Sequence, residues 1–177
     1  MHGGGAESME LFDEIYRKYQ PDVTRFLYRL TGFDTQLTEE LTQEIFYQAY
    51  LSFPRFRGEC TMKTWLCQIA RNVYGKHIRR EIRQRGITNQ LAAETSETGS
   101  DIREDFENAE QIRHIRQIIS EMKEPARTVT EYRLYSEMSY AEIAELLHIR
   151  EGTAAVIFNR AKAKIRQRLK EEYGYEI

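Results

Sequence analysis

Residues Thr61–Arg85, TMKTWLCQIARNVYGKHIRREIRQR, form the stretch that decides how this chain folds. The first half repeats apolar residues every three or four positions, which is typical of an amphipathic helix packed on a core. These residues are Met62, Trp65, Leu66, Ile69, Ala70 and Val73. The second half, from Arg71 to Arg85, holds six basic residues and one acid, Glu81. The stretch therefore predicts one long helix that is buried at one end. Its basic end either binds a polyanion or is an ordinary solvent-exposed helix surface.

The composition is typical of a small soluble protein. Its 177 residues allow one sizeable domain or two small ones, and 31% of them are charged. No run of apolar residues approaches the length of a membrane span. The first ten residues, MHGGGAESME, lack the basic start and apolar core of a secretory signal. We expect a cytoplasmic protein without direct membrane insertion, and a disordered lead-in at residues 1–8.

Motifs for catalysis or cofactor binding do not stand out. Cys60 and Cys67 are too few for a disulfide framework or a zinc site, and the four histidines are scattered. We find no nucleophile elbow, no Gly-rich phosphate loop and no paired carboxylates at a recognisable spacing. The sequence therefore predicts reduced cysteines, no metal, no cofactor and no enzymatic activity.

Charge is distributed in blocks that the net charge of −2 conceals. A second basic block lies between Thr153 and Lys170, with six basic residues and no acid. Between the two basic blocks, Glu94–Glu110 holds seven acids and one base. Two basic surfaces joined by an acidic connector are a pattern found in chains that bind nucleic acid.

Helical periodicity extends over most of the chain, and no useful length alternates with period two. In residues 9–31, Pro21 predicts a break or kink between two helices, and Gly32 a helix end. Asp34 or Thr35 is a candidate cap for a helix that runs to about Phe53. We expect an all-α fold of two small helical domains, residues 9–88 and 107–177, joined by a flexible acidic linker at 89–106.

The sharpest local pattern lies in the second domain, between Ser139 and Ala163. Ser139 and Glu142 form a predicted capping box at the start of a short helix. His148 to Glu151 form a predicted tight turn. A final helix follows from about Gly152. This pattern predicts a helix-turn-helix whose second helix enters a DNA major groove, although a generic helical hairpin has similar spacing.

Three motifs in order resemble the sigma factors of the extracytoplasmic-function (ECF) group, in the sigma-70 superfamily. The first is Glu40–Phe46, ELTQEIF, and the second is Trp65–Asn72, WLCQIARN. The third is Ser139–Leu147, SYAEIAELL, which Glu151–Thr153 follow. The resemblance covers roughly residues 9 to 171. It implies an alternative sigma factor that binds core RNA polymerase, recognises promoter DNA and directs transcription initiation.

The resemblance also implies roles for individual residues in the first domain. The positions that match the family's polymerase-binding helix are Glu40, Gln43 and Glu44. The positions that match its reader of the minus-ten element, at the upstream edge of the transcription bubble, are Arg57, Lys63, Arg71, Asn72, Lys76, Arg79 and Arg80. Arg71 and Arg80 have an alternative structural role, and Asn72 an alternative role in a local backbone bridge. Trp65 is a tempting stacking platform, but its position on the buried stripe favours core packing.

In the second domain the resemblance implies that the final helix reads duplex DNA near minus thirty-five. The candidate residues are Thr153, Ala155, Val156, Asn159, Arg160 and Lys162. Here the chain departs from the family, since Ala155, Val156 and Ile157 replace polar and basic residues. His148 also replaces the family's turn glycine, at a position where a positive φ is often needed. Apolar side chains cannot donate to base edges but can contact thymine methyl groups, and asparagine can read adenine. Base readout is therefore expected to be weaker or shifted toward A·T pairs.

Two further expectations come from the family alone. An anti-sigma factor that covers both DNA-binding faces is an implied partner, and the acidic linker resembles the family's connector through the polymerase channels. The competing interpretation is a stand-alone helix-turn-helix regulator that binds operator DNA as a dimer. A small helical enzyme is a third, for which the sequence offers no nucleophile or metal set.

Overall fold

A computed structural model of the chain describes residues 4–87 and 103–175. Within those residues every regular element is a helix, as the sequence predicts. The chain divides into two compact units, residues 1–92 and 93–177, and each is described here by itself. No helix in the described ranges is both long and apolar enough to cross a membrane.

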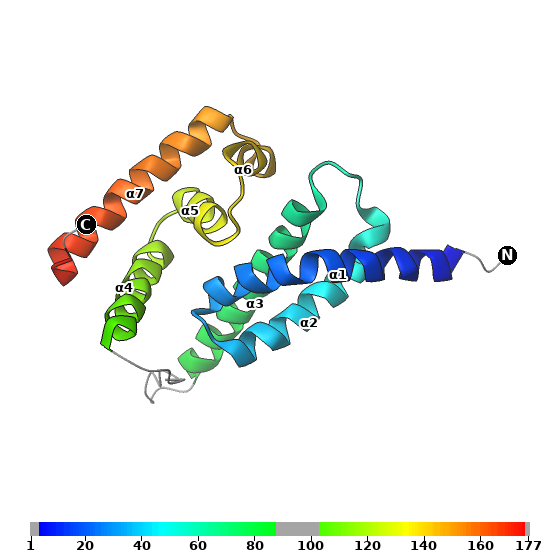
Figure 1. The fold of residues 1–177 in the computed structure, drawn as a ribbon, viewed down its shortest axis with the longest axis horizontal. Coiled ribbons are helices and arrows are strands. Elements are labelled where there is room, and N and C mark those ends of the chain that lie inside the picture. Colours follow the sequence, from blue (N-terminus) through cyan, green and yellow to red (C-terminus); the bar gives the residue numbers. More distant parts are fainter. Residues whose placement is uncertain (1–3, 88–102, 176–177) are drawn as a thin grey trace. The chain divides into compact units, whose positions relative to one another are not determined.

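The first unit is a bundle of three α-helices, shown in blue to green in Figure 1. They are α1 (Gly4–Thr31), α2 (Thr35–Ser52) and α3 (Met62–Ile87), with a 3-10 turn, η1 (Phe53–Arg55), after α2. Each α-helix contacts the other two. The core side chains are Phe12, Ile15, Val23, Phe26, Leu27, Leu30, Leu41, Ile45, Phe46, Ala49, Leu66, Cys67, Ala70 and Val73.

The predicted break at Pro21 is wrong, because α1 continues through this residue without interruption. Pro21 is exposed, so its ring faces solvent rather than the core. Buried residues lie on the same face before and after the proline, including Phe12 and Phe26. Burial along both halves offsets the one backbone hydrogen bond that proline removes.

The ends of these helices follow the local signals in the sequence. The α1 helix ends at Thr31, and Gly32 then takes a φ of 82°. Asp34 caps α2 by accepting a hydrogen bond from the Leu37 amide at 2.9 Å. Thr61 caps α3, since its Oγ1 accepts from the Thr64 amide at 3.2 Å. Each cap satisfies a backbone N–H that the helix itself leaves unpaired.

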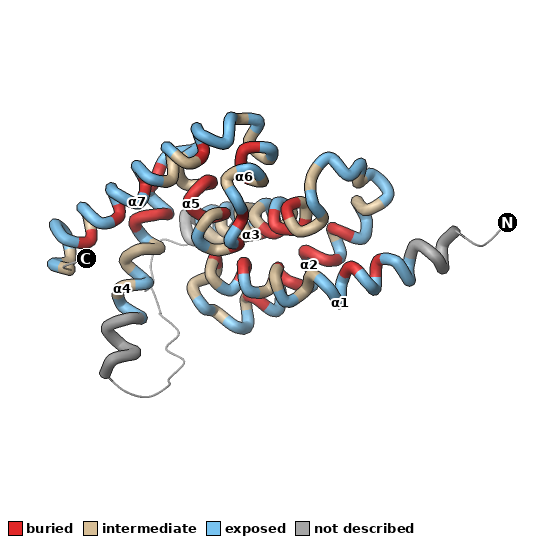
Figure 2. Tube along the Cα trace, turned by 45° about the horizontal axis from the view of Figure 1, so that its top comes forward, coloured by how far each residue is buried: buried red, intermediate tan, exposed pale blue. Residues whose placement is uncertain are grey.

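The second unit contains α4 (Arg103–Ser120), α5 (Ala126–Tyr135), α6 (Tyr140–Leu147) and α7 (Glu151–Tyr173). The long helix α7 contacts the other three. One buried cluster joins α4 to α7, and it consists of Ile118, Ile119, Met122, Ala161, Ile165 and Leu169. Figure 2 shows the buried positions as a stripe along one side of α7 and exposed positions along the other.

Arg168 on α7 ties this helix to α4 at the edge of the cluster. Its Nη1 donates to Glu121 Oε2 at 2.7 Å, and its Nη2 donates to Glu172 Oε2 at 2.8 Å. These hydrogen bonds lower the pKa of both carboxyl groups and raise the pKa of the guanidinium. The folded protein therefore stabilises the charged form of each of these three groups.

Some predicted boundaries differ from the structure. The α1 helix begins at Gly4, inside the predicted lead-in at residues 1–8. The α4 helix begins at Arg103, so the end of the predicted linker at 89–106 is helical. The rest of that linker, residues 89–102, lies outside the described residues.

Candidate nucleic-acid interface

The exposed side of α3 carries a line of polar and basic side chains, which we call the α3 stripe. Its members are Gln68, Asn72, Lys76, Arg79 and Arg83, and all are exposed. They are spaced by three or four residues, so they share one face of the helix. The opposite face is buried against α1 and α2 through Leu66, Ala70 and Val73. Packing therefore fixes which cations face solvent.

Two of the sequence-predicted candidates on α3 lie off this stripe. Lys63 points to another side of α3, where its Nζ lies 4.0 Å from Asp22 Oδ2 of α1. Arg71 is partly buried and interacts within the chain, as its alternative structural role requires. Arg80 is exposed and lies four residues after Lys76, about 40° around the helix, so it borders the α3 stripe. The structure thus brings Asn72, Lys76, Arg79 and Arg80 to one side of α3 and separates Lys63 and Arg71 from them.

A pocket of about 360 Å³ opens at the N-terminal end of α3. Its walls come from the loop before α3 and from the first turns of the helix. The lining residues are Arg55, Phe56, Arg57, Glu59, Cys60, Trp65 and Gln68. Because Gln68 also belongs to the α3 stripe, the pocket and the line of cations form one continuous surface.

Trp65 is less buried than the sequence predicts and lines this pocket. Its ring packs against Phe56, with centroids 4.9 Å apart and planes tilted by 42°. Leu66, the next residue, is fully buried, so the backbone beneath Trp65 is fixed. The aromatic pair therefore supplies an apolar wall held by the core.

Cations stand at the mouth of the pocket. The side chain of Arg57 is 84% exposed, and its Nη1 lies 4.0 Å from Glu59 Oε1. At this exposure the ion pair contributes little, so the guanidinium is available to a ligand. Sequence reasoning identified Arg57 but missed Arg55, Gln68 and Arg83. For Gln68 and Arg83 the signal was present, since they lie four residues from Asn72 and Arg79.

The predicted helix-turn-helix is confirmed in the second unit by α6 and α7. Ser139 and Glu142 make both hydrogen bonds of a capping box: the Ser139 amide donates to Glu142 Oε2 at 2.8 Å, and the Glu142 amide donates to Ser139 Oγ at 3.2 Å. His148 ends α6 in the left-handed region, with φ 54° and ψ 42°. Ala144 and Ala154 are buried small residues, which allows the two helices to approach closely.

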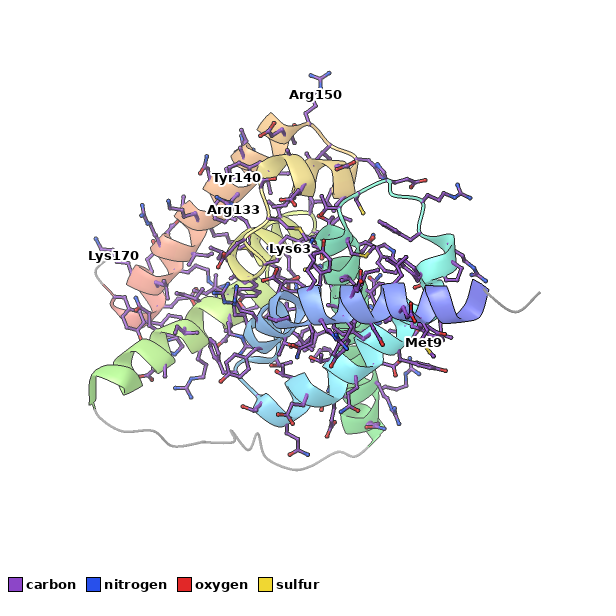
Figure 3. The ribbon with its side chains drawn as sticks, turned by 45° about the vertical axis from the view of Figure 1, so that its right-hand side comes forward. Met9, Lys63, Arg133, Tyr140, Arg150 and Lys170 are labelled. Atoms are coloured by element: carbon purple, nitrogen blue, oxygen red, sulfur yellow. The ribbon has the colours of Figure 1, made fainter. Side chains whose placement is uncertain are left out.

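Contacts from α5 fix the entry to this motif. The Arg133 Nη1 donates to the Met138 carbonyl at 3.0 Å, and its guanidinium lies 5.0 Å from the centroid of the Tyr140 ring. Figure 3 labels both side chains where they meet between α5 and α6. A cation over an aromatic face is attractive, so the pair holds the first turn of α6 against α5.

The start of α7 presents its candidate residues to solvent. Thr153, Val156 and Asn159 are exposed, as are Arg160 and Lys162, and half of the Val156 surface is accessible. Ala155 is partly buried, which makes it the least accessible candidate. Arg150, which sequence reasoning did not single out, extends into solvent just before the helix (Figure 3). This end of α7 therefore combines one apolar contact, one amide and several cations.

The exposed face of α2 forms a third surface, of a different character. Glu40, Gln43 and Glu44 all face solvent, as the sequence predicts for a binding face. The same face continues with Tyr47 and Leu51, which are 58% and 53% exposed. Sequence reasoning did not assign a role to these two residues. Large apolar side chains beside two carboxylates make this surface suited to a basic protein partner rather than to DNA.

Comparison with known families matches both units. Residues 15–84 match Sigma-70 region 2, and residues 112–165 match Sigma-70, region 4. ECF RNA polymerase sigma factor SigM of Bacillus subtilis is 30% identical over 170 residues, which cover 92% of this chain and 94% of SigM. RNA polymerase sigma-H factor of Pseudomonas aeruginosa is 29% identical, over 87% of this chain and 83% of that protein.

Solved structures agree with this family at the level of the fold. The sigma factor RpoE from Bartonella quintana, solved in complex with the anti-sigma factor NepR, has a TM-score of 0.61 at 19% identity. The match covers 91% of this chain and 98% of RpoE. The family matches and the relationship to SigM show that the chain belongs to the ECF sigma factors of the sigma-70 family.

Proposed function

We propose that this alternative sigma factor acts by binding alone, with three surfaces that engage core RNA polymerase, melted promoter DNA and duplex promoter DNA. The α2 face docks on the polymerase, the α3 stripe and its pocket hold one opened strand, and α7 reads the duplex upstream. The protein works in the cytoplasm, where the polymerase is, and performs no catalytic step of its own.

The polymerase contact rests on the α2 face. Tyr47 and Leu51 supply apolar area toward the C-terminal end of this face, and Glu40 and Glu44 supply charge toward its N-terminal end. Gln48 Nε2 donates to Glu44 Oε1 at 2.8 Å, which orients that carboxylate along the helix. Protein interfaces combine apolar area with polar and charged groups, as this face does. A basic coiled coil on the polymerase would complement it in both shape and charge.

The continuity of the pocket with the α3 stripe is the observation that carries the DNA proposal. Recognition of a melted strand requires a pocket for an extruded base and cations for the flanking phosphates. Phe56 and Trp65 offer ring surface to the base, and Gln68 offers an amide to its edge. Lys76 and Arg79 follow along the same face of α3 and neutralise successive phosphates.

The duplex contact rests on the first turns of α7. Val156 contacts a thymine methyl group, Asn159 reads an adenine, and Arg160 and Lys162 hold phosphates. Thr153, at the exposed start of the helix, adds a hydroxyl for a phosphate oxygen. The expected outcome is a preference for A·T pairs upstream, weaker than that of a helix with polar residues at Ala155 and Val156.

An anti-sigma factor is the regulatory partner that we infer. Two similar solved structures are complexes: RpoE is bound to the anti-sigma factor NepR, and CnrH is bound to the cytosolic domain of CnrY. Exposed cations and an exposed apolar face on an unbound sigma factor would bind nucleic acid and other proteins non-specifically. A partner that covers these surfaces until a signal releases it would prevent them.

Reconstitution with core RNA polymerase tests this function. Co-elution with core and promoter-specific transcription are expected, and Gln43→Ala or Glu44→Arg should weaken co-elution. Arg160→Ala should weaken duplex binding by the holoenzyme. A protein that ignores core polymerase yet binds a palindromic duplex as a dimer would instead be a stand-alone regulator, which the family membership does not favour. Wild-type co-elution by both α2 variants would remove the docking assignment.

A further inference from the structure

Gly75 occupies the middle of α3, where its presence has no explanation within the protein. It has ordinary helical backbone geometry, and α3 continues without interruption on both sides. Glycine is among the least favourable residues in a helix interior, since it loses the most backbone freedom on folding. A glycine at such a position needs a compensating role.

Packing against the protein does not supply that role. A Cβ added at Gly75 would meet only the guanidinium of Arg79, with Nη1 at 3.7 Å and Nη2 at 3.9 Å. Both are ordinary contact distances to the end of a flexible side chain. Among the residues that the structure describes, no neighbouring helix comes within 4 Å of the added Cβ, so alanine would fit without any rearrangement.

The position of Gly75 on the helix points to a ligand instead. It lies three residues after Asn72 and four before Arg79, beside Lys76, and so borders the α3 stripe. The Arg79 guanidinium lies over the bare backbone at this point, close to the surface of the helix. A phosphate paired with that guanidinium would have to come close to the backbone of Gly75 itself.

We propose that Gly75 is the point at which the sugar-phosphate backbone of the melted promoter strand lies directly on α3. The missing side chain lets the Arg79 guanidinium lie against the helix backbone, and a strand paired with that guanidinium comes into contact with α3 at this point. Gly75 thus positions the strand without contributing any charge. This inference rests on the proposed binding of a melted strand by the α3 stripe.

Two substitutions separate close approach from electrostatic attraction. Gly75→Ala adds one methyl group and should raise the melting temperature of the free protein by a few degrees, because it improves helix propensity. Gly75→Lys adds a cation, which by charge alone should tighten DNA binding. If the strand lies on the glycine, both variants should instead bind a premelted promoter template about tenfold more weakly, in the holoenzyme. Their affinity for core polymerase should equal that of the wild type.

Lys76→Ala and Arg79→Ala are measured in the same assay. They show whether a failed prediction for Gly75 concerns this residue alone or the whole α3 stripe as the DNA site. Wild-type template binding by Gly75→Ala, or tighter binding by Gly75→Lys, would overturn the role of Gly75. A loss with Lys76→Ala and Arg79→Ala would then leave the α3 stripe intact as a DNA site. If those two variants also bind normally, the stripe is not the DNA site and both proposals fall.

Discussion

Removing the three cations of the α3 stripe should make promoter binding markedly less sensitive to salt. The change is the triple substitution of Lys76, Arg79 and Arg83 by glutamine, all exposed on one face of α3. Each phosphate contact on a single strand contributes about 0.7 to the slope of log affinity against log salt. Three lost contacts should therefore reduce the slope by about 2. Across a fourfold range of salt, the ratio of wild-type to variant affinity should change about sixteenfold.

Fluorescence anisotropy of a labelled, premelted promoter template, titrated with holoenzyme at several KCl concentrations, measures this slope. A matched triple variant replaces Arg17, Lys18 and Arg25, which are exposed on α1, and removes the same net charge. It should retain the wild-type slope. Equal losses in the two triples would show that the effect follows net charge and would refute the assignment of the α3 stripe as the phosphate contact.

Tyr47→Ala should weaken binding to core polymerase about tenfold or more, because aromatic residues are enriched among interface hot spots. Glu39→Ala, on the flank of α2, should not weaken binding, and titration of labelled core polymerase measures both variants. Maleimide should modify Cys60 at the pocket before the other, buried cysteine, and the adduct should fill the pocket and reduce promoter opening; normal opening by the labelled protein would count against the pocket. His148→Gly should raise the free energy of unfolding by about 0.5–1 kcal/mol in urea, since relief of the left-handed conformation exceeds the entropy cost of glycine, and a decrease would contradict this. Hydrogen bonds from Arg168 lower the pKa of two carboxyl groups, so the stability they add is complete above the ordinary carboxyl pKa of about 4.3 and disappears as pH falls through the lowered values. Arg168→Gln should thus lower the melting temperature more at pH 7 than in acid, and a difference independent of pH would be inconsistent with that linkage.

Local signals in the sequence predicted the helix ends well. The cap at Asp34, the capping box at Ser139 and the left-handed residue at His148 are all found in the structure. Each depends on hydrogen bonds or backbone sterics within a few residues, so it does not require knowledge of the packed fold. Pro21 is different, because burial of α1 on both sides of the proline overrides the local preference for a break.

The candidate site was harder to predict because it depends on the orientation of α3. Composition identified a basic helix but did not separate Lys63, paired with Asp22, from Lys76 on the exposed stripe. Only the buried face of α3 fixes that difference. The pocket beside Trp65 combines a loop with a helix, and no periodicity in the sequence describes such a combination.

Transcription by reconstituted holoenzyme on genomic DNA of the source, with the 5′ ends of the transcripts mapped, tests the central claim most directly. Core polymerase plus this chain should initiate at a defined set of sites that share a melted element and a duplex element upstream. Core polymerase alone, or core with the Lys76, Arg79 and Arg83 triple variant, should not use these sites. The same scattered initiation with and without the chain would contradict the account.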